Sequence, residues 1–279
     1  MKTIISLLFV LIIGFSANAQ LDFIAAKDAA KLMNDDNTIF VSMRTPTDYQ
    51  KVHVVGAVNI DHKDLYGEMS MLKSPTDIAK ILGQKGLAAN KNIILYDDGS
   101  GKYAGRMYWI LDYMGATNVQ IIDGGMKGWR LARKPVTKNP SQITPATFTP
   151  NINKAVYADM ASVKQALNQS NYMVVDARSE AEFAGTASTN LRPGRIPGAV
   201  NFDFQQVLTP QGMIKPVGEL TSLFENAGIS KAKSIILYCE SSVRAGILYA
   251  TLKGLGYTKV SVYDGAYLEW QASPANKVL

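Results

Sequence analysis

The sequence is a tandem duplication, and this feature limits the possible folds more than any other. Short blocks from the first half return in the second half in the same order, 134 to 142 residues later. They are NIILYD at 92–97 and SIILYC at 234–239, GAVN at 56–59 and 198–201, DGGMKGW at 123–129 and DGAYLEW at 264–270, and VSMR at 41–44 and VDAR at 175–178. Because each copy of about 120 residues is long enough for its own core, we expect two domains of the same architecture.

Within each copy, short β-branched runs alternate with longer amphipathic stretches. In the second copy we expect strands at 172–175, 235–238 and 259–262, and helices at 160–167, 219–227 and 243–255. Strands that are apolar at consecutive positions are typical of parallel sheets buried on both faces. The sequence therefore predicts the α/β class, with each domain a mainly parallel β-sheet flanked by helices on both faces.

The predicted boundaries place domain one at 20–134 and domain two at 156–279. The linker between them, 135–155, holds Pro135, Pro140, Pro145 and Pro150. Proline fixes φ and lacks a backbone donor, so we expect an extended connector along the surface.

Residues 1–19 resemble a cleaved secretory signal peptide rather than part of the fold. Lys2 supplies the positive charge, Ile4 to Phe15 is almost wholly apolar, and Ala17 and Ala19 suit a signal peptidase. A retained N-terminal anchor is the alternative. We therefore expect a periplasmic or secreted protein with no membrane attachment once the signal is removed.

Composition excludes several classes of function. One cysteine among 279 residues rules out an intramolecular disulfide, and two histidines leave too few ligands for a thiolate-rich zinc site. We expect no metal and no cofactor. The net charge of +6 comes from scattered basic residues, so nucleic acid is not implied as a partner, and we expect a monomer.

The single cysteine stands where a parallel α/β fold places reactive groups. Cys239 follows the strand at 235–238 and precedes the helix that begins near Ala245, and ligands in such folds bind beyond the carboxyl ends of the strands. The loop between them reads Glu240, Ser241, Ser242, Val243, Arg244. Backbone N–H groups at a helix N-terminus, together with an arginine, stabilise an anion. We therefore predict that Cys239 is a nucleophile whose thiolate form is stabilised by the loop. The Glu240 carboxylate would disfavour the thiolate if it points inward.

These motifs together resemble the tandem-domain rhodanese family of sulfurtransferases. The resemblance rests on VVDAR at 174–178, RIPGAVN at 195–201, the loop from Cys239 to Arg244 and DGAYLEW at 264–270, and it covers nearly all of the chain after residue 19. It implies two rhodanese-like domains, of which the second is catalytic. Domain one carries Asp97 at the cysteine position and is expected to be inactive.

The resemblance also implies a chemical cycle. Cys239 would take a sulfane sulfur from a small anionic donor, thiosulfate or 3-mercaptopyruvate, and pass it from a persulfide to cyanide or a thiol. Glu240, Ser241, Ser242, Val243 and Arg244 would form the loop that holds the persulfide. Asp176 and Arg178 lie at a strand end. They could form an internal ion pair that orients the loop, or they could contact the substrate, and the sequence leaves both roles open.

The chain departs from the family pattern at several positions. Two-domain members commonly have glycine where Ser242 stands, so a positive φ there would strain the serine. Animal-type members have a substrate-binding arginine at the position of Glu182. Because Glu182 would repel an anion, we expect Arg192, Arg195 or Arg244 to supply the positive charge.

Parts of the sequence also resemble features of three other functions. A cysteine phosphatase needs five residues between its cysteine and arginine, whereas four separate Cys239 from Arg244. The glycines at 99 and 101 fit a dinucleotide-binding fingerprint that Asp123 would complete. This aspartate recurs as Asp264 in the second copy, where no glycine loop precedes it. The glycine turn is therefore better explained as a degenerate copy of the loop that follows Cys239. A non-catalytic exported module that binds an anion or a partner stays open as the alternative to the enzyme.

Overall fold

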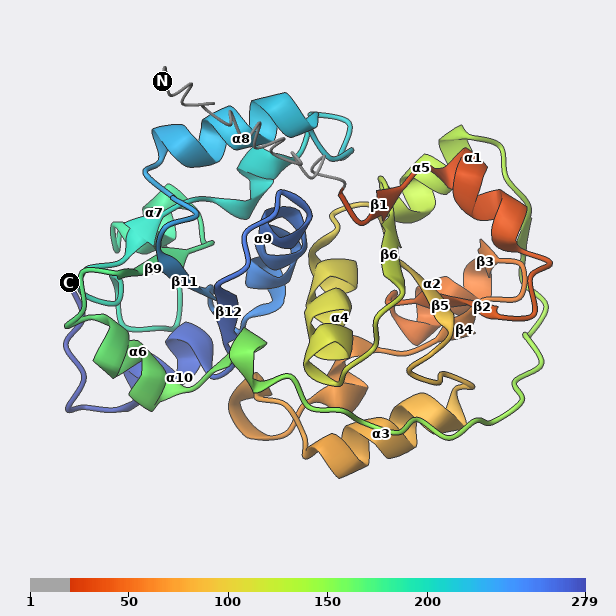
Figure 1. The fold of residues 1–279 in the computed structure, drawn as a ribbon, viewed down its shortest axis with the longest axis horizontal. Helices are drawn as coiled ribbons and strands as arrows, with labels where there is room; N and C mark the ends of the chain where they lie inside the picture. Colours follow the sequence, from red (N-terminus) through yellow and green to blue (C-terminus); the bar gives the residue numbers. More distant parts are fainter. Residues whose placement is uncertain (1–20) are drawn as a thin grey trace, which may run out of the picture.

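A computed structural model describes residues 21–279, and the signal peptide predicted at 1–19 lies outside them. Figure 1 shows two lobes, each built around a five-stranded sheet whose strands are all parallel. Sheet one has the order β1 (Phe23–Ile24), β6 (Val119–Ile122), β5 (Asn92–Tyr96), β2 (Thr38–Ser42), β4 (Val58–Asn59). Sheet two has the order β8 (Tyr157–Ala158), β12 (Val260–Tyr263), β11 (Ser234–Tyr238), β9 (Tyr172–Asp176), β10 (Val200–Asn201). The two orders are equivalent strand by strand, as the duplication predicts.

The helices also correspond between the lobes. Domain one contains α1 (Ala26–Ala29), α2 (Pro46–Lys51), α3 (Pro75–Gln84), α4 (Lys102–Tyr113) and α5 (Gly125–Leu131). Domain two contains α6 (Met160–Ala166), α7 (Glu180–Phe183), α8 (Val217–Asn226), α9 (Val243–Gly254) and α10 (Ala266–Ala272). Short 3-10 helices lie at 30–32, 62–65, 68–70, 154–156 and 204–207. The strands and helices predicted for the second copy are confirmed to within three residues at each end.

Side chains alternate between the two faces of each sheet, as strand geometry requires. In β11, Ile235 and Leu237 face a large apolar core shared by both domains, while Ile236 and Tyr238 face a smaller core of domain two. In β5, the residues at 93 and 95 join the shared core and those at 94 and 96 join a second small core of domain one. Both faces of each sheet are therefore buried, which confirms the predicted layers.

The two domains meet where α4 crosses α9 (Figure 1). Gly105 and Gly246 lie at this crossing. A Cβ on Gly105 would lie 2.4 Å from the backbone nitrogen of Ile247, and a Cβ on Gly246 would lie 2.3 Å from the backbone nitrogen of Arg106. Side chains of that size would force the helices apart. The reciprocal glycines therefore set how closely the two copies dock.

The proline-rich segment runs along domain one, and part of it pairs with that domain. Its first residues form β7 (Val136–Thr137), which pairs antiparallel with β3 (His53–Val54). Farther along, the N–H of residue 146 donates to the Gly83 carbonyl oxygen at 2.8 Å. Within residues 21–279, the structure contains no helix with the length and apolarity that a membrane crossing demands.

Candidate active site

Cys239 lies directly after the central strand β11 and directly before the turn that begins α9. It is a free thiol and only 1% exposed. Because Ile235, Leu237 and Cys239 alternate along one face, the thiol points toward the shared core between the domains. The sequence therefore placed this side chain correctly at the carboxyl edge of the sheet.

The N-terminus of α9 presents a backbone donor to this sulfur. The N–H of Arg244 donates to the Cys239 Sγ at 3.3 Å, and no side chain caps the helix. By contrast, α2, α3, α6 and α7 are each capped by a Ser, Thr or Asp side chain that accepts from their first turn. The uncapped N–H groups and the helix dipole favour negative charge at the cysteine.

Ser242 holds the turn before α9 in a left-handed conformation. Its φ is 59°, and the corresponding residue before α4 is Gly101 with φ of 68°. The Ser242 side chain is fully buried, and its hydroxyl donates to the Tyr263 carbonyl oxygen. The turn therefore needs the positive φ that the family glycine suggested, and a buried hydrogen bond accompanies the strained serine.

In domain one, the N-terminus of the equivalent helix α4 faces a carboxylate in place of the sulfur. The Asp97 side chain accepts N–H groups from Gly99 (2.9 Å), Gly101 (3.1 Å), Tyr103 (3.1 Å) and Ala104 (3.4 Å). When α4 and α9 are aligned by their first residues, Tyr103 corresponds to Arg244. The N–H that faces the sulfur in domain two therefore faces a carboxylate oxygen in domain one.

The charge of Arg244 is already paired. Its guanidinium donates to both Glu182 carboxylate oxygens at 2.6 and 2.8 Å, and Nη2 lies 3.6 Å from Glu240 Oε2. Burial would raise the pKa of Glu182, but hydrogen bonds from Arg244 and Ser179 outweigh it and lower that pKa to about 2. Glu182 therefore binds an arginine of the cysteine loop, a pairing that the sequence did not reveal.

The other sequence candidates take two different positions. Asp176 and Arg178 form a buried ion pair at 2.6 Å, and Arg178 also donates to the Gly194 carbonyl oxygen at 2.8 Å, so this pair is internal to domain two. Arg192 contacts carbonyl oxygens of Gln271 and other residues near the C-terminus at 3.3 to 3.5 Å.

Arg195 stacks on the Phe183 ring of α7 at 4.6 Å and donates to the carbonyl oxygen of the same residue at 3.5 Å. Ser241 and Val243 are half-buried within the cysteine loop. The roles of Arg192 and Arg195 toward a substrate stay predictions.

Sequence reasoning missed a polar cluster that domain one brings to the same edge of sheet two. Arg106 of α4 is fully buried, and its Nη2 donates to the Asp264 carboxylate at 2.6 Å. The Tyr66 ring lies 5.4 Å from the Arg106 guanidinium carbon. The position of Arg106 in the buried middle of α4, between Gly105 and Met107, was the one available signal for this cluster.

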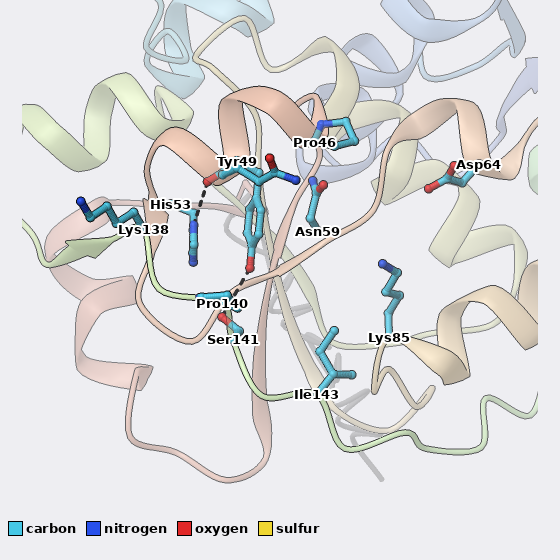
Figure 2. Close-up of a pocket in the computed structure, with 11 residues that line it drawn as sticks. Pro46, Tyr49, His53, Asn59, Asp64, Lys85, Lys138, Pro140, Ser141 and Ile143 are labelled. Carbon is cyan, nitrogen blue, oxygen red and sulfur yellow. Dashed lines mark hydrogen bonds between the residues drawn. The ribbon is translucent and has the colours of Figure 1, made fainter.

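Neither histidine forms a hydrogen bond with the Cys239 sulfur in the described residues. His62 packs against the rings of Tyr66 and Tyr103, with centroids 5.7 and 4.3 Å apart. Figure 2 shows the surroundings of His53, in a cavity of about 400 Å³ between domain one and the linker. Its ring nitrogens lie 2.8 Å from the Tyr49 carbonyl oxygen and 3.1 Å from that of residue 139. The position of His53 is therefore that of a residue packing the linker against domain one.

Comparisons with known proteins agree with this architecture. The model of the rhodanese-like domain matches twice, at residues 25–132 and 159–273. The chain is 26% identical to thiosulfate sulfurtransferase of Pseudomonas aeruginosa, over 91% of this chain and 96% of that protein. It is 30% identical to 3-mercaptopyruvate sulfurtransferase of Mus musculus, over 80% of this chain and 78% of that protein.

A solved structure with the same fold is that of an anaerobic ergothioneine biosynthesis enzyme from Chlorobium limicola. Its TM-score is 0.85 at 22% identity, and the match covers 92% of this chain and 69% of the other. The paired family matches, the duplicated parallel sheets and the cysteine loop at the end of β11 lead to one assignment. The chain belongs to the tandem-domain rhodanese family of sulfurtransferases.

Proposed function

We propose that this protein transfers sulfane sulfur through a persulfide on Cys239. The observation that carries this proposal is the position of the Cys239 Sγ, at the end of the central parallel strand and 3.3 Å from the Arg244 N–H at an uncapped helix N-terminus. That environment stabilises both a thiolate and the terminal sulfur anion of a persulfide. The donor we propose is thiosulfate or 3-mercaptopyruvate, and the acceptor is cyanide or a thiol.

With thiosulfate, the reaction takes two displacement steps. The Cys239 thiolate attacks the outer sulfur, a new S–S bond forms, and sulfite leaves with the electron pair of the broken sulfur–sulfur bond. Cyanide then attacks the outer sulfur of the persulfide, thiocyanate leaves, and the thiolate returns. A covalent carrier divides one transfer between two anions into two separate displacements.

Domain one does not carry sulfur in this proposal. Asp97 occupies the position of the cysteine, and its carboxylate already accepts the N–H groups that open α4. A carboxylate cannot form a persulfide. Domain one therefore acts as a wall of the site and as the source of the residues that face Cys239 from across the interface.

Intact mass measurement tests the persulfide directly. After treatment with thiosulfate, the wild-type protein should gain about 32 Da, the mass of one sulfur atom, and Cys239→Ala should gain nothing. Thiocyanate release from thiosulfate and cyanide should likewise be lost in Cys239→Ser. Equal release from both proteins would contradict the assignment. No mass gain with either donor would favour the non-catalytic binding module, which the near-complete burial of Cys239 supports.

We also propose that the protein is exported and acts as a monomer. The support is the signal-like sequence at 1–19 and the docking of the two copies within one chain. Cell fractionation with a C-terminal tag, together with the N-terminal sequence of the mature protein, tests cleavage after Ala19. Light scattering tests the monomer.

A further inference from the structure

Three buried polar atoms next to the interface have no hydrogen-bond partner. They are the Tyr66 hydroxyl and the Nε and Nη1 of Arg106, and they are the unpartnered buried side-chain N and O atoms within residues 21–279. Leaving one buried donor without an acceptor costs about 1 to 3 kcal/mol, so native proteins rarely gather three in one place. Both side chains come from domain one, and Arg106 is 0% exposed.

This group lies at the strand edge that carries Cys239. Leu237 of β11 pairs with Val262 of β12, so Cys239 and Asp264 follow that pair by two residues on neighbouring strands. Neighbouring strands lie about 5 Å apart, and alternate residues point to the same face. Asp264 fixes the Arg106 guanidinium through one nitrogen and leaves the other two with free donors. The donors therefore face the same side of sheet two as the sulfur.

The electrostatic surroundings of Tyr66 agree with this placement. Burial raises the pKa of Tyr66, the charge of Arg106 and a weak polar contact with it oppose that rise, and the charges of Asp264 and Cys239 add to it. The sulfur is thus close enough for its charge to act on the phenol. A hydroxyl in this position is neutral at physiological pH and can donate a hydrogen bond.

The arginines that domain two offers at the cysteine loop are neutralised. Arg244 is bound to Glu182 through two hydrogen bonds, and Arg178 is bound to Asp176. A sulfur donor with an anionic head group nevertheless needs hydrogen-bond donors once it leaves water. The buried donors of domain one, by contrast, have no acceptor of their own within residues 21–279.

We propose that the Tyr66 hydroxyl and the Nε and Nη1 of Arg106 form a subsite for the oxyanion head group of the sulfur donor. This inference rests on the proposed function. The head group is the sulfonate of thiosulfate or the carboxylate of 3-mercaptopyruvate. Its oxygens accept from the two side chains of domain one, and the sulfane or thiol sulfur is directed toward Cys239. When the sulfur–sulfur bond of thiosulfate breaks, the electron pair moves to the departing sulfite, whose oxygens stay hydrogen-bonded to the same donors.

The variant Tyr66→Phe separates this role from a structural one. Because the hydroxyl makes no hydrogen bond of normal geometry and only a weaker contact with Arg106, its removal costs the fold little, and stability should be nearly unchanged. The hydrogen bond to an oxyanion would be lost, so we expect the KM for thiosulfate to rise about tenfold or more. The matched control is Tyr249→Phe, which removes a hydroxyl that donates to Asp112 at 2.6 Å. That variant should lower stability and leave KM unchanged.

Two measurements make the outcome decisive. Titration of inorganic sulfite into the wild type and into Tyr66→Phe, followed by calorimetry, reports the subsite without turnover, and we expect weaker binding in the variant. A rise in KM for thiosulfate alone assigns the subsite to the sulfonate, and a rise for 3-mercaptopyruvate alone or for both donors extends it to the carboxylate. Unchanged KM for both donors together with unchanged sulfite binding would overturn the subsite. Absence of persulfide in the wild type would instead overturn the proposed function, and sulfite binding would still decide the subsite.

Discussion

Ser242 is the residue whose replacement tests the local energetics of the cysteine loop most directly. Its φ of 59° places a non-glycine residue in the left-handed region, which costs about 1 kcal/mol. Its buried hydroxyl donates to the Tyr263 carbonyl oxygen, and such a bond contributes about 1 kcal/mol net. The two effects nearly cancel in the native protein.

The variants Ser242→Gly and Ser242→Ala separate these effects. Both lose the hydroxyl, but only glycine relieves the strain. We therefore expect Ala to destabilise the protein by about 1 to 2 kcal/mol and Gly by less than about 1 kcal/mol. Glycine should be more stable than alanine by about 1 kcal/mol, or about 2 to 4 °C in Tm for a chain of this size. At an ordinary helical position the order is reversed, with alanine favoured by about 1 kcal/mol.

Urea denaturation followed by tryptophan fluorescence and by far-ultraviolet circular dichroism measures the difference. Both probes are needed because two domains can unfold separately, and coincident transitions justify a single free energy of unfolding. Alanine as stable as glycine would refute the strain at Ser242. Thiocyanate release by Ser242→Gly provides a second reading, because a loop that keeps its shape should keep its activity.

Three further predictions concern other parts of the molecule. Glu182→Gln should lower the KM for thiosulfate, because it releases the charge of Arg244. The pKa of Glu182 is depressed to about 2, so the stability that the carboxylate contributes is present above about pH 5 and is lost as the pH falls toward 2. The difference in unfolding free energy between wild type and variant should therefore narrow over that pH range. Gly105→Ala should destabilise the protein by about 3 kcal/mol, because the new Cβ would lie 2.4 Å from the Ile247 nitrogen, whereas Gly218→Ala, with no atom within 4 Å, should not destabilise it in the same denaturation assay. Asp97→Ala should lower stability by about 3 kcal/mol by removing the acceptor of four N–H groups, while thiocyanate release stays at the wild-type rate.

Much of the fold could be predicted because the signals that determine it are local or repeated. The apolar run that ends at Tyr238 predicted a buried parallel strand, and its counterpart ending at Tyr96 confirmed the period. Because the two copies share the order of their blocks, one strand order had to serve both sheets. The position of Cys239 followed from these two facts, whereas the left-handed turn at Ser242 was suggested only by the glycine that related proteins carry there.

The side-chain pairings at the site could not be predicted in the same way. Glu182 and Arg244 are 62 residues apart, and the sequence alone suggested that the glutamate would repel an anion. Arg106 and Asp264 are 158 residues apart and belong to different domains. Such pairs depend on how two packed units dock and on the rotamers that docking allows, and no spacing within one element encodes either.

The duplication also shows where the two halves have ceased to be equivalent. Asp123 and Asp264 correspond, and each accepts a backbone N–H from the other domain, from Ile214 at 2.7 Å and from Leu72 at 2.9 Å. Only Asp264 also binds a buried arginine, since the position of Arg106 is taken by isoleucine in the second copy.

The tyrosine that adjoins this arginine, Tyr66, likewise corresponds to Leu208. The symmetric aspartate contacts are enough to dock the domains, because on the opposite side Asp123 serves without a buried arginine beside it. The additional polar groups occur on the side that faces Cys239 and not on the side that faces Asp97. Docking alone does not account for that difference, whereas the oxyanion subsite that we propose beside Cys239 does.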